Sequence, residues 1–290
     1  MKTPLFTGVC TALVTPFWGG KVNYPLAEQL LRRQMDAGIP AVVLSGTTGE
    51  ASTLSDEEKA LLFARSKAFA GNQCKIIAGT GSNCTAHAVT LSQTAEKAGA
   101  DGLLVVSPYY NKATPEGLVA HYLSIAYAVN IPIIIYNVPT RTGVDIPVSV
   151  YRELSMHPNI VGVKESTGDI TKITAIRTAC GDDFTIWSGN DDQIVPVTAL
   201  GGKGVISVLS NVLPEETAQM TNAALSGDYK TASRLQCKLS PLIRQLFCEV
   251  NPIPVKAAME LLGYDCGGCR LPLTDIRPEN REKLQALLGK

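Results

Sequence analysis

The chain has 290 residues, of which 45% are hydrophobic, so it can bury a large core within the size range of one α/β barrel. Its 26 basic and 26 acidic residues cancel, and the isoelectric point lies near 6.8. No overall charge therefore favours nucleic acid or an anionic membrane, and we expect a small-molecule partner.

The N-terminal segment 1–17 lacks the apolar core and cleavage pattern of a signal peptide. No stretch of the sequence approaches the roughly 18 uninterrupted apolar residues of a membrane span. We therefore expect a cytoplasmic protein without a membrane partner.

Short apolar runs alternate along the chain with longer amphipathic segments. Eight runs are predicted as strands: 8–17, 41–46, 75–81, 102–110, 131–139, 159–166, 184–191 and 204–210. Most are continuously apolar, which is typical of parallel strands buried on both faces. Six helices are predicted between or after them: 25–38, 55–71, 83–100, 114–129, 168–181 and 213–227. Ser55 and Glu58 have the spacing of a capping box, and Gly38, Gly71 and Gly99 stand where helices should end.

This alternation predicts a (β/α)8 TIM barrel over residues 1–226. The alternative is an open doubly wound sheet, but no glycine-rich dinucleotide motif follows the first strand. Strand patterns disappear from residue 227, and 227–290 is predicted as a C-terminal helical extension.

Eight cysteines are scattered along the chain, and one pair is compact, in the CGGC segment from Cys266 to Cys269. A structural zinc site needs four ligands, and no second pair or nearby histidine completes one here. Reduced thiols in a glycine-rich loop are favoured over a metal or redox role, and no metal or cofactor is expected.

Polar residues cluster where the predicted strands end, which is where the catalytic groups of a barrel lie. Lys164 ends the apolar run 160–163. One interpretation is a lysine at the barrel rim that pairs with neighbouring Glu165. The other is a Schiff-base lysine, because a water-poor strand end favours the neutral amine that attacks a carbonyl.

Residues at other strand ends could serve the same reaction. Tyr136 could fill space at the rim or relay protons beside an amine. Thr47 and Thr48 could be turn residues, or their hydroxyl and backbone N–H groups could bind a carboxylate. Arg141 could be a solvated loop residue or a planar fork for a second carboxylate.

Four motifs resemble the dihydrodipicolinate synthase and N-acetylneuraminate lyase group of class I aldolases, and the resemblance runs nearly from end to end. They are GTTGE (46–50), PYYNK (108–112), YNVPTRTG (136–143) and GVKEST (162–167). Within the group, the resemblance implies condensation of pyruvate with L-aspartate 4-semialdehyde on the route to diaminopimelate and lysine.

The resemblance also implies roles for single residues. Lys164 would form the pyruvate imine and Tyr136 would transfer protons. Thr47 would link Tyr136 by hydrogen bonds towards Tyr110, which would reach into a neighbouring subunit's site. The group is commonly a dimer of dimers, so a homotetramer is expected.

The same resemblance assigns the substrate-binding residues. Thr48 would hold the pyruvate carboxylate, Arg141 would receive the carboxylate of the semialdehyde, and Gly189 and Ile206 would line the pyruvate pocket. Sugar-acid lyases of the group usually lack the arginine of PTRTG, and a site built around it should reject a substrate that leaves this charge unpaired. A lyase of that kind and a non-catalytic, ligand-sensing barrel are the alternatives.

Some members of the group bind lysine as a feedback inhibitor through an acidic residue and histidines at a subunit interface. The matching positions here hold His87, Asp56 and Lys59. The lost carboxylate and the added ammonium both disfavour a cationic ligand, although Asp56 offsets this in part. Weak or absent lysine inhibition is therefore expected.

Overall fold

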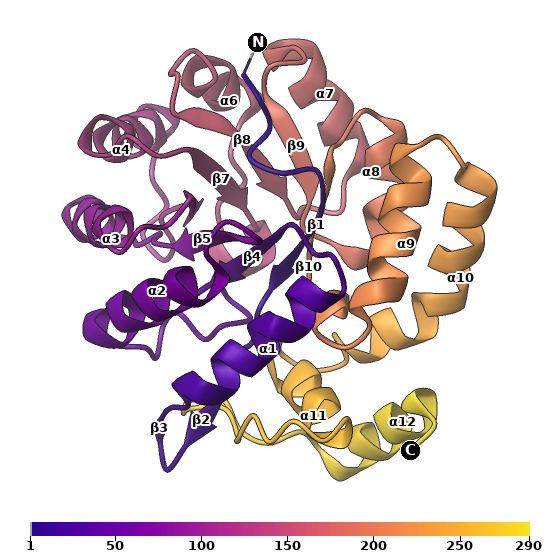
Figure 1. The fold of residues 1–290 in the computed structure, drawn as a ribbon. Helices are drawn as coiled ribbons and strands as arrows, with labels where there is room; N and C mark the ends of the chain where they lie inside the picture. Colours follow the sequence, from indigo (N-terminus) through magenta and orange to yellow (C-terminus); the bar gives the residue numbers. More distant parts are fainter. Residues whose placement is uncertain (1) are drawn as a thin grey trace.

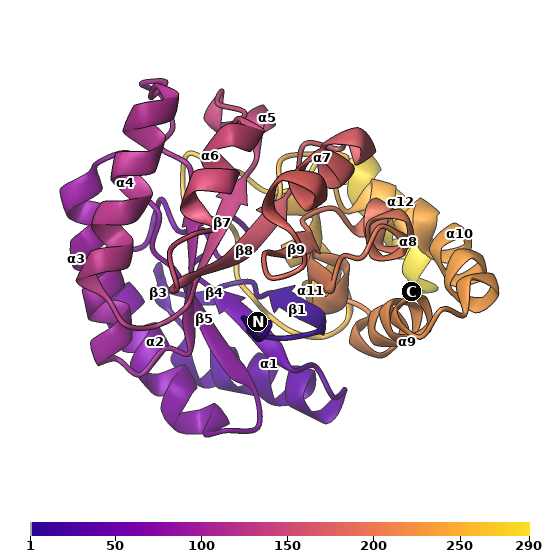
Figure 2. The same cartoon turned by 90° about the horizontal axis from the view of Figure 1, so that it is seen from above.

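The computed structural model describes residues 2–290 and contains a closed barrel of eight parallel strands, as predicted (Figures 1 and 2). The strands are adjacent in the order β1-β10-β9-β8-β7-β6-β5-β4. Their bounds are β1 Gly8–Ala12, β4 Ala41–Leu44, β5 Lys75–Gly79, β6 Gly102–Val106, β7 Ile133–Asn137, β8 Ile160–Glu165, β9 Thr185–Ser188 and β10 Gly204–Ser207. The open-sheet alternative is therefore wrong.

Helices surround the barrel on its outside (Figure 2). They are α1 Tyr24–Asp36, α2 Asp56–Ala70, α3 Thr85–Lys97, α4 Pro115–Ala128, α5 Pro139–Thr142, α6 Val148–Leu154, α7 Ile170–Cys180, α8 Ile194–Ala199 and α9 Pro214–Leu225, with the 3-10 turns η1 Asp191–Gln193 and η2 Leu209–Asn211. The capping box at Ser55 is confirmed, since its side chain and that of Glu58 exchange hydrogen bonds with each other's backbone N–H groups. No helix is predicted from the sequence at α5, α6 or α8, which are only four, seven and six residues long. Such short segments carry little of the 3.6-residue periodicity on which prediction depends.

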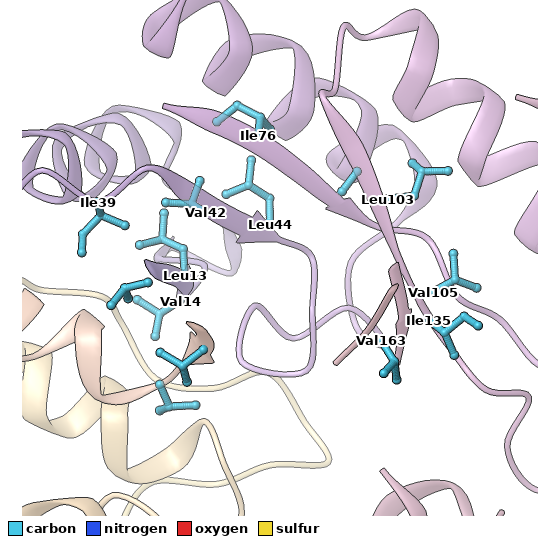
Figure 3. Close-up of a cluster of buried hydrophobic side chains, with 14 of the residues drawn as sticks. Leu13, Val14, Ile39, Val42, Leu44, Ile76, Leu103, Val105, Ile135 and Val163 are labelled. Atoms are coloured by element: carbon cyan, nitrogen blue, oxygen red, sulfur yellow. The ribbon is translucent and has the colours of Figure 1, made fainter. Parts of the chain in front are cut away.

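The apolar residues form two layers. A large cluster lies between the strands and the helices, and Val42, Leu44, Ile76, Val105 and Val163 belong to it (Figure 3). A smaller cluster fills the barrel interior, and its members are Leu5, Phe6, Cys10, Ala12, Ala41, Val43, Ile77, Leu104, Ile134, Tyr136, Val138, Val161, Trp187 and Ile206. The barrel is therefore packed rather than hollow, and polar chemistry is confined to its ends.

An irregularity in β8 decides which of its residues face inwards. Ile133 of β7 pairs with Ile160, but Ile134 pairs with Gly162, so the ladder skips Val161. Ile160, before the skipped residue, and Val163, after it, both belong to the outer cluster, although residues three apart on a regular strand face opposite sides. Bulges of this kind re-aim side chains, and Lys164 consequently points into the barrel beside Tyr136.

Three further helices follow the barrel: α10 Tyr229–Gln245, α11 Ile253–Leu261 and α12 Pro278–Leu288. The segment between α11 and α12 runs back beside the short hairpin of β2 Phe17–Trp18 and β3 Lys21–Val22, which the sequence did not predict (Figure 1). The Phe17 N–H donates to the Cys266 carbonyl at 2.9 Å there. The C-terminal helices are confirmed, whereas a domain boundary at residue 226 stays a prediction. No helix within residues 2–290 is both long and apolar enough to cross a membrane.

Candidate active site

Lys164 and Tyr136 lie side by side on adjacent strands, near the carboxyl ends of β8 and β7. The Lys164 Nζ is 4.3 Å from the centroid of the Tyr136 ring, and each residue is 6% exposed. Within residues 2–290, no ion pair or side-chain hydrogen bond involves the Lys164 ammonium. Burial raises the pKa of the Asp191 carboxyl group, and the Lys164 ammonium acts on it in the opposite direction. An amine held inside the barrel mouth against an aromatic ring, rather than paired at the rim, has the placement that a Schiff-base lysine needs.

Glu165 points to the opposite face of β8 and does not neutralise Lys164. Its carboxylate accepts hydrogen bonds from the Asn137 side chain at 3.0 and 3.1 Å, the Tyr151 hydroxyl at 3.2 Å and the Thr167 N–H at 2.9 Å. Burial raises the pKa of this carboxyl group above its ordinary value, while nearby Lys172 acts in the opposite direction. The interpretation of Lys164 as a rim lysine paired with Glu165 is therefore wrong.

A cavity of about 460 Å³ opens at the carboxyl ends of β4 to β7. Thr47, Tyr136 and Arg141 all line it, so three of the predicted site residues meet in one space. Tyr136 joins this cavity to Lys164, because its ring contacts the amine and its side chain also lines the wall. The volume suits a small metabolite.

The loop 46–50 after β4 presents its two threonines in different directions. Thr47 lines the cavity, but its side chain makes no hydrogen bond with Tyr136 in the part of the chain described. Thr48 is buried, and its Oγ1 accepts a hydrogen bond from the Asn251 Nδ2 at 3.0 Å. The Thr48 hydroxyl is therefore anchored to the C-terminal region.

Ile206 lies on β10, and Gly189 lies just beyond the end of β9. Ile206 is fully buried in β10 and belongs to the interior cluster. Gly189 directly follows β9, and its N–H donates to the Glu165 carbonyl at 2.8 Å. A Cβ atom at Gly189 would overlap the Ser166 Oγ and lie 3.1 Å from the Glu165 carbonyl oxygen, so a larger residue here would force the Ser166 side chain to move.

Tyr110 does not line the cavity of its own chain. It is 84% exposed, and its backbone has a φ of 75°. A non-glycine residue in this region of φ is uncommon and costs conformational energy, and such strain concentrates at functional positions. The structure therefore leaves the Tyr110 side chain free to contact something outside its own subunit.

Three residues that line the cavity were given no role from the sequence. Val250 and Asn251, from the segment before α11, line it together with the barrel residues. Ser45 also lines it, and its buried Oγ has no hydrogen-bond partner among the described residues. The SGTTGE motif could have drawn attention to Ser45, whereas no local signal connects residues 250–251 to the loop after β4.

The cavity extends to the residues discussed for lysine binding. Asp56, Lys59 and His87 line it, and the His87 Nε2 is 2.9 Å from the Asp56 Oδ2. The Lys59 Nζ is 3.6 Å from the other Asp56 oxygen. The hydrogen bond from His87 lowers the pKa of Asp56, which keeps this carboxylate ionised and occupied by its neighbours.

Cys266 and Cys269 are free thiols in the structure. Burial raises the pKa of each to about 12, so neither is a thiolate near neutral pH. Because the thiolate is the form that reacts in redox exchange and binds metals, these two cysteines lack the activation that a redox pair shows.

The chain was compared with known proteins. The Dihydrodipicolinate synthetase family matches residues 5–290. A 4-hydroxy-tetrahydrodipicolinate synthase of Thermoanaerobacter sp. (strain X514) is 49% identical over 290 residues, covering 99% of this chain and 97% of the relative. The synthase of that name from Acetivibrio thermocellus is 46% identical, covering 99% and 98%.

Solved structures agree with these relatives. Dihydrodipicolinate synthase from Aquifex aeolicus superimposes with a TM-score of 0.96 at 44% identity, covering 98% of this chain and 97% of that one. The enzyme from Thermotoga maritima gives a TM-score of 0.96 at 39% identity, covering 99% and 98%. The barrel, the position of Lys164 beside Tyr136 and the match over nearly the whole length lead to one conclusion: the chain belongs to the dihydrodipicolinate synthetase family.

Proposed function

We propose that this protein is a 4-hydroxy-tetrahydrodipicolinate synthase, which condenses pyruvate with L-aspartate 4-semialdehyde on the route to diaminopimelate and lysine. The observation that carries the proposal is the Lys164 amine, which is buried against the Tyr136 ring and forms no ion pair within the described residues. Relatives that carry this enzyme name are up to 49% identical over nearly the full length.

The chemistry needs the unprotonated form of the Lys164 amine beside the Tyr136 phenol. The Lys164 nitrogen attacks the C2 carbonyl carbon of pyruvate, and loss of water from the carbinolamine gives an iminium. The iminium withdraws electrons, so C3 loses a proton and the resulting enamine attacks the aldehyde carbon of the second substrate. Tyr136 moves protons in carbinolamine collapse and in protonation of the new alkoxide. Transfer of the substrate's amino group onto the imine carbon then closes the ring and releases Lys164.

The remaining site residues bind and orient. We assign binding of the pyruvate carboxylate to Thr48 and the backbone of its loop. Gly189 and Ile206 are assigned to contact the apolar side of pyruvate. Thr47 lines the cavity with Tyr136 and is assigned to the proton relay. The Tyr136 and Thr47 hydroxyls would need to approach each other when substrate binds, because catalytic hydrogen bonds often form fully only in the substrate complex.

Borohydride reduction in the presence of pyruvate tests this function directly. Reduction traps an imine as a stable secondary amine, and mass mapping should place the added group on Lys164 alone. Labelling of a different lysine, or none, would refute the proposal. Turnover of the semialdehyde would then separate an enzyme from a ligand-sensing barrel.

Arg141 should decide the second substrate. It lies in α5, is exposed and lines the cavity, so its guanidinium can receive the semialdehyde carboxylate. We expect Arg141→Leu to raise the KM for the semialdehyde by about tenfold or more, since a charge-assisted hydrogen bond is lost, and to leave pyruvate trapping unchanged. Steady-state kinetics with N-acetylmannosamine as the competing substrate provides the comparison. Preference for the sugar by the unaltered enzyme would favour a sugar-acid lyase instead.

We further infer that Tyr110 completes the site of a neighbouring subunit within a dimer of dimers. Its exposure and its strained backbone support this role. Tyr110→Phe should lower the rate and leave the oligomeric state, measured by sedimentation, unchanged. Tyr127 is also an exposed tyrosine, and Tyr127→Phe should leave the rate unchanged. A monomeric enzyme with full activity would contradict the inference.

Lysine should inhibit this enzyme weakly or not at all. The Asp56 carboxylate already contacts Lys59 and His87, and the Lys59 ammonium repels a second cation. A relative from Cyanidioschyzon merolae, 40% identical, was solved with lysine bound. We expect His87→Glu combined with Lys59→Ala to increase sensitivity to lysine in a kinetic assay. Strong inhibition of the unaltered enzyme by sub-millimolar lysine would show that the reasoning is wrong.

A further inference from the structure

The loop from Ser45 to Glu50 is strained at both of its ends. Ser45 has a φ of 54° and Glu50 a φ of 57°, and neither is a glycine. Residues held in this region persist only where the surrounding structure enforces it. Thr47 and Thr48 lie between these two positions, so the strained loop is also the one that carries site residues. Its conformation therefore needs an external restraint.

The restraint comes from the C-terminal region. The Lys256 Nζ of α11 lies 2.9 Å from the Glu50 Oε1 and donates a second hydrogen bond to the Gly268 carbonyl at 2.9 Å. The other Glu50 oxygen accepts from the Arg270 N–H at 2.8 Å. Both oxygens of the Glu50 carboxylate are thereby fixed by residues more than 200 positions further along the chain.

The Glu50–Lys256 ion pair is almost completely buried, with side chains 1% and 3% exposed. Burying two charges carries a large desolvation cost, so a pair of this kind is often no more stabilising than apolar residues of similar volume. A contribution to stability therefore does not explain why this ion pair is buried. Its role is better explained by the fixed geometry that it imposes on Glu50, the last residue of the strained loop.

We propose that Glu50 and Lys256 are positioning residues for the 2-oxo acid. They hold the loop 46–50 in the conformation that places Thr47 on the cavity and presents the backbone N–H groups of the loop to a carboxylate. The Asn251 side chain restrains Thr48 from the same region. The inference rests on the proposed function, since it assigns the loop to the pyruvate carboxylate.

The double variant Glu50→Gln/Lys256→Met tests the proposal. It removes both charges and leaves neither buried alone, so it should fold with a thermal midpoint close to that of the unaltered enzyme. The pyruvate concentration for half-maximal borohydride trapping at Lys164 should nevertheless rise by about tenfold, because the loop relaxes from its strained conformation. The KM for the semialdehyde should stay unchanged.

A matched control removes an ion pair from the same region that does not touch the loop. Arg281 and Glu260 are partly exposed and 2.8 Å apart, and Glu260→Gln/Arg281→Met should trap pyruvate normally. Normal pyruvate affinity in the Glu50→Gln/Lys256→Met enzyme would overturn the positioning role while leaving the proposed function intact. Failure of the unaltered enzyme to trap pyruvate would instead overturn the proposed function, and this inference with it.

Discussion

A Lys164→Met enzyme is expected to lose pyruvate-dependent trapping entirely and to fall in kcat/KM by at least about 1,000-fold. Methionine is apolar and of similar length, so it can fill the same space in the barrel interior without supplying an amine. The fall should therefore reflect lost chemistry rather than lost packing, and thermal unfolding should occur near the original midpoint. Mass mapping after borohydride reduction and a steady-state assay measure the two effects.

Lys172→Met provides the matched control. Lys172 is also largely buried, but it lies on α7 outside the barrel and pairs with Asp145. Its loss should affect stability and leave trapping at Lys164 in place. If the Lys172 variant stopped trapping pyruvate and the Lys164 variant did not, the assignment of the nucleophile would be wrong.

A Tyr136→Phe enzyme should retain the ring that packs against Lys164 and lose only the hydroxyl. We expect kcat to fall by about 100-fold or more, which is the usual contribution of a positioned acid or base, with little change in the KM for pyruvate. The imine should still be trapped at ordinary pyruvate concentrations after longer incubation. Single-turnover kinetics distinguishes slow proton transfer from weak binding.

The control for Tyr136 is another buried tyrosine. Tyr122 on α4 donates its hydroxyl hydrogen to the Val105 carbonyl at 3.2 Å, outside the barrel interior. Tyr122→Phe should leave kcat unchanged and at most lower stability. Equal losses of kcat in both variants would indicate a general effect of removing buried hydroxyls and would contradict proton transfer by Tyr136.

The barrel could be predicted because its strands are continuous apolar runs separated by long amphipathic segments. The prediction failed where these signals are short. The helices α6 and α8 span only seven and six residues, and β2 and β3 two residues each. Such elements form because neighbouring structure stabilises them, and a local pattern does not encode that support.

Those residues of the candidate site that lie at or just after the ends of strands could be predicted from the sequence. Tyr136 and Arg141 were found because polar residues after apolar runs meet at one end of a barrel, and the structure places both at one cavity. The anchoring of Thr48 was not predictable. Its partner Asn251 lies 203 residues away, in a segment that reads only as the approach to a helix.

The skipped residue in β8 has a consequence for how this strand can change in evolution. Successive side chains along a strand point alternately to its two faces. The extra residue at Val161 interrupts this alternation once, before the strand reaches Lys164. Loss of Val161 itself would remove the bulge and leave Lys164 opposite Tyr136, because Ile160 and Gly162 already pair with consecutive residues of β7. Loss of a residue after the bulge, such as Val163, would instead turn Lys164 towards the helices and Glu165 into the barrel, without any change in the identity of either residue. The strand can therefore lose its extra residue and keep the amine in place, whereas the residues between the bulge and Lys164 cannot change in number.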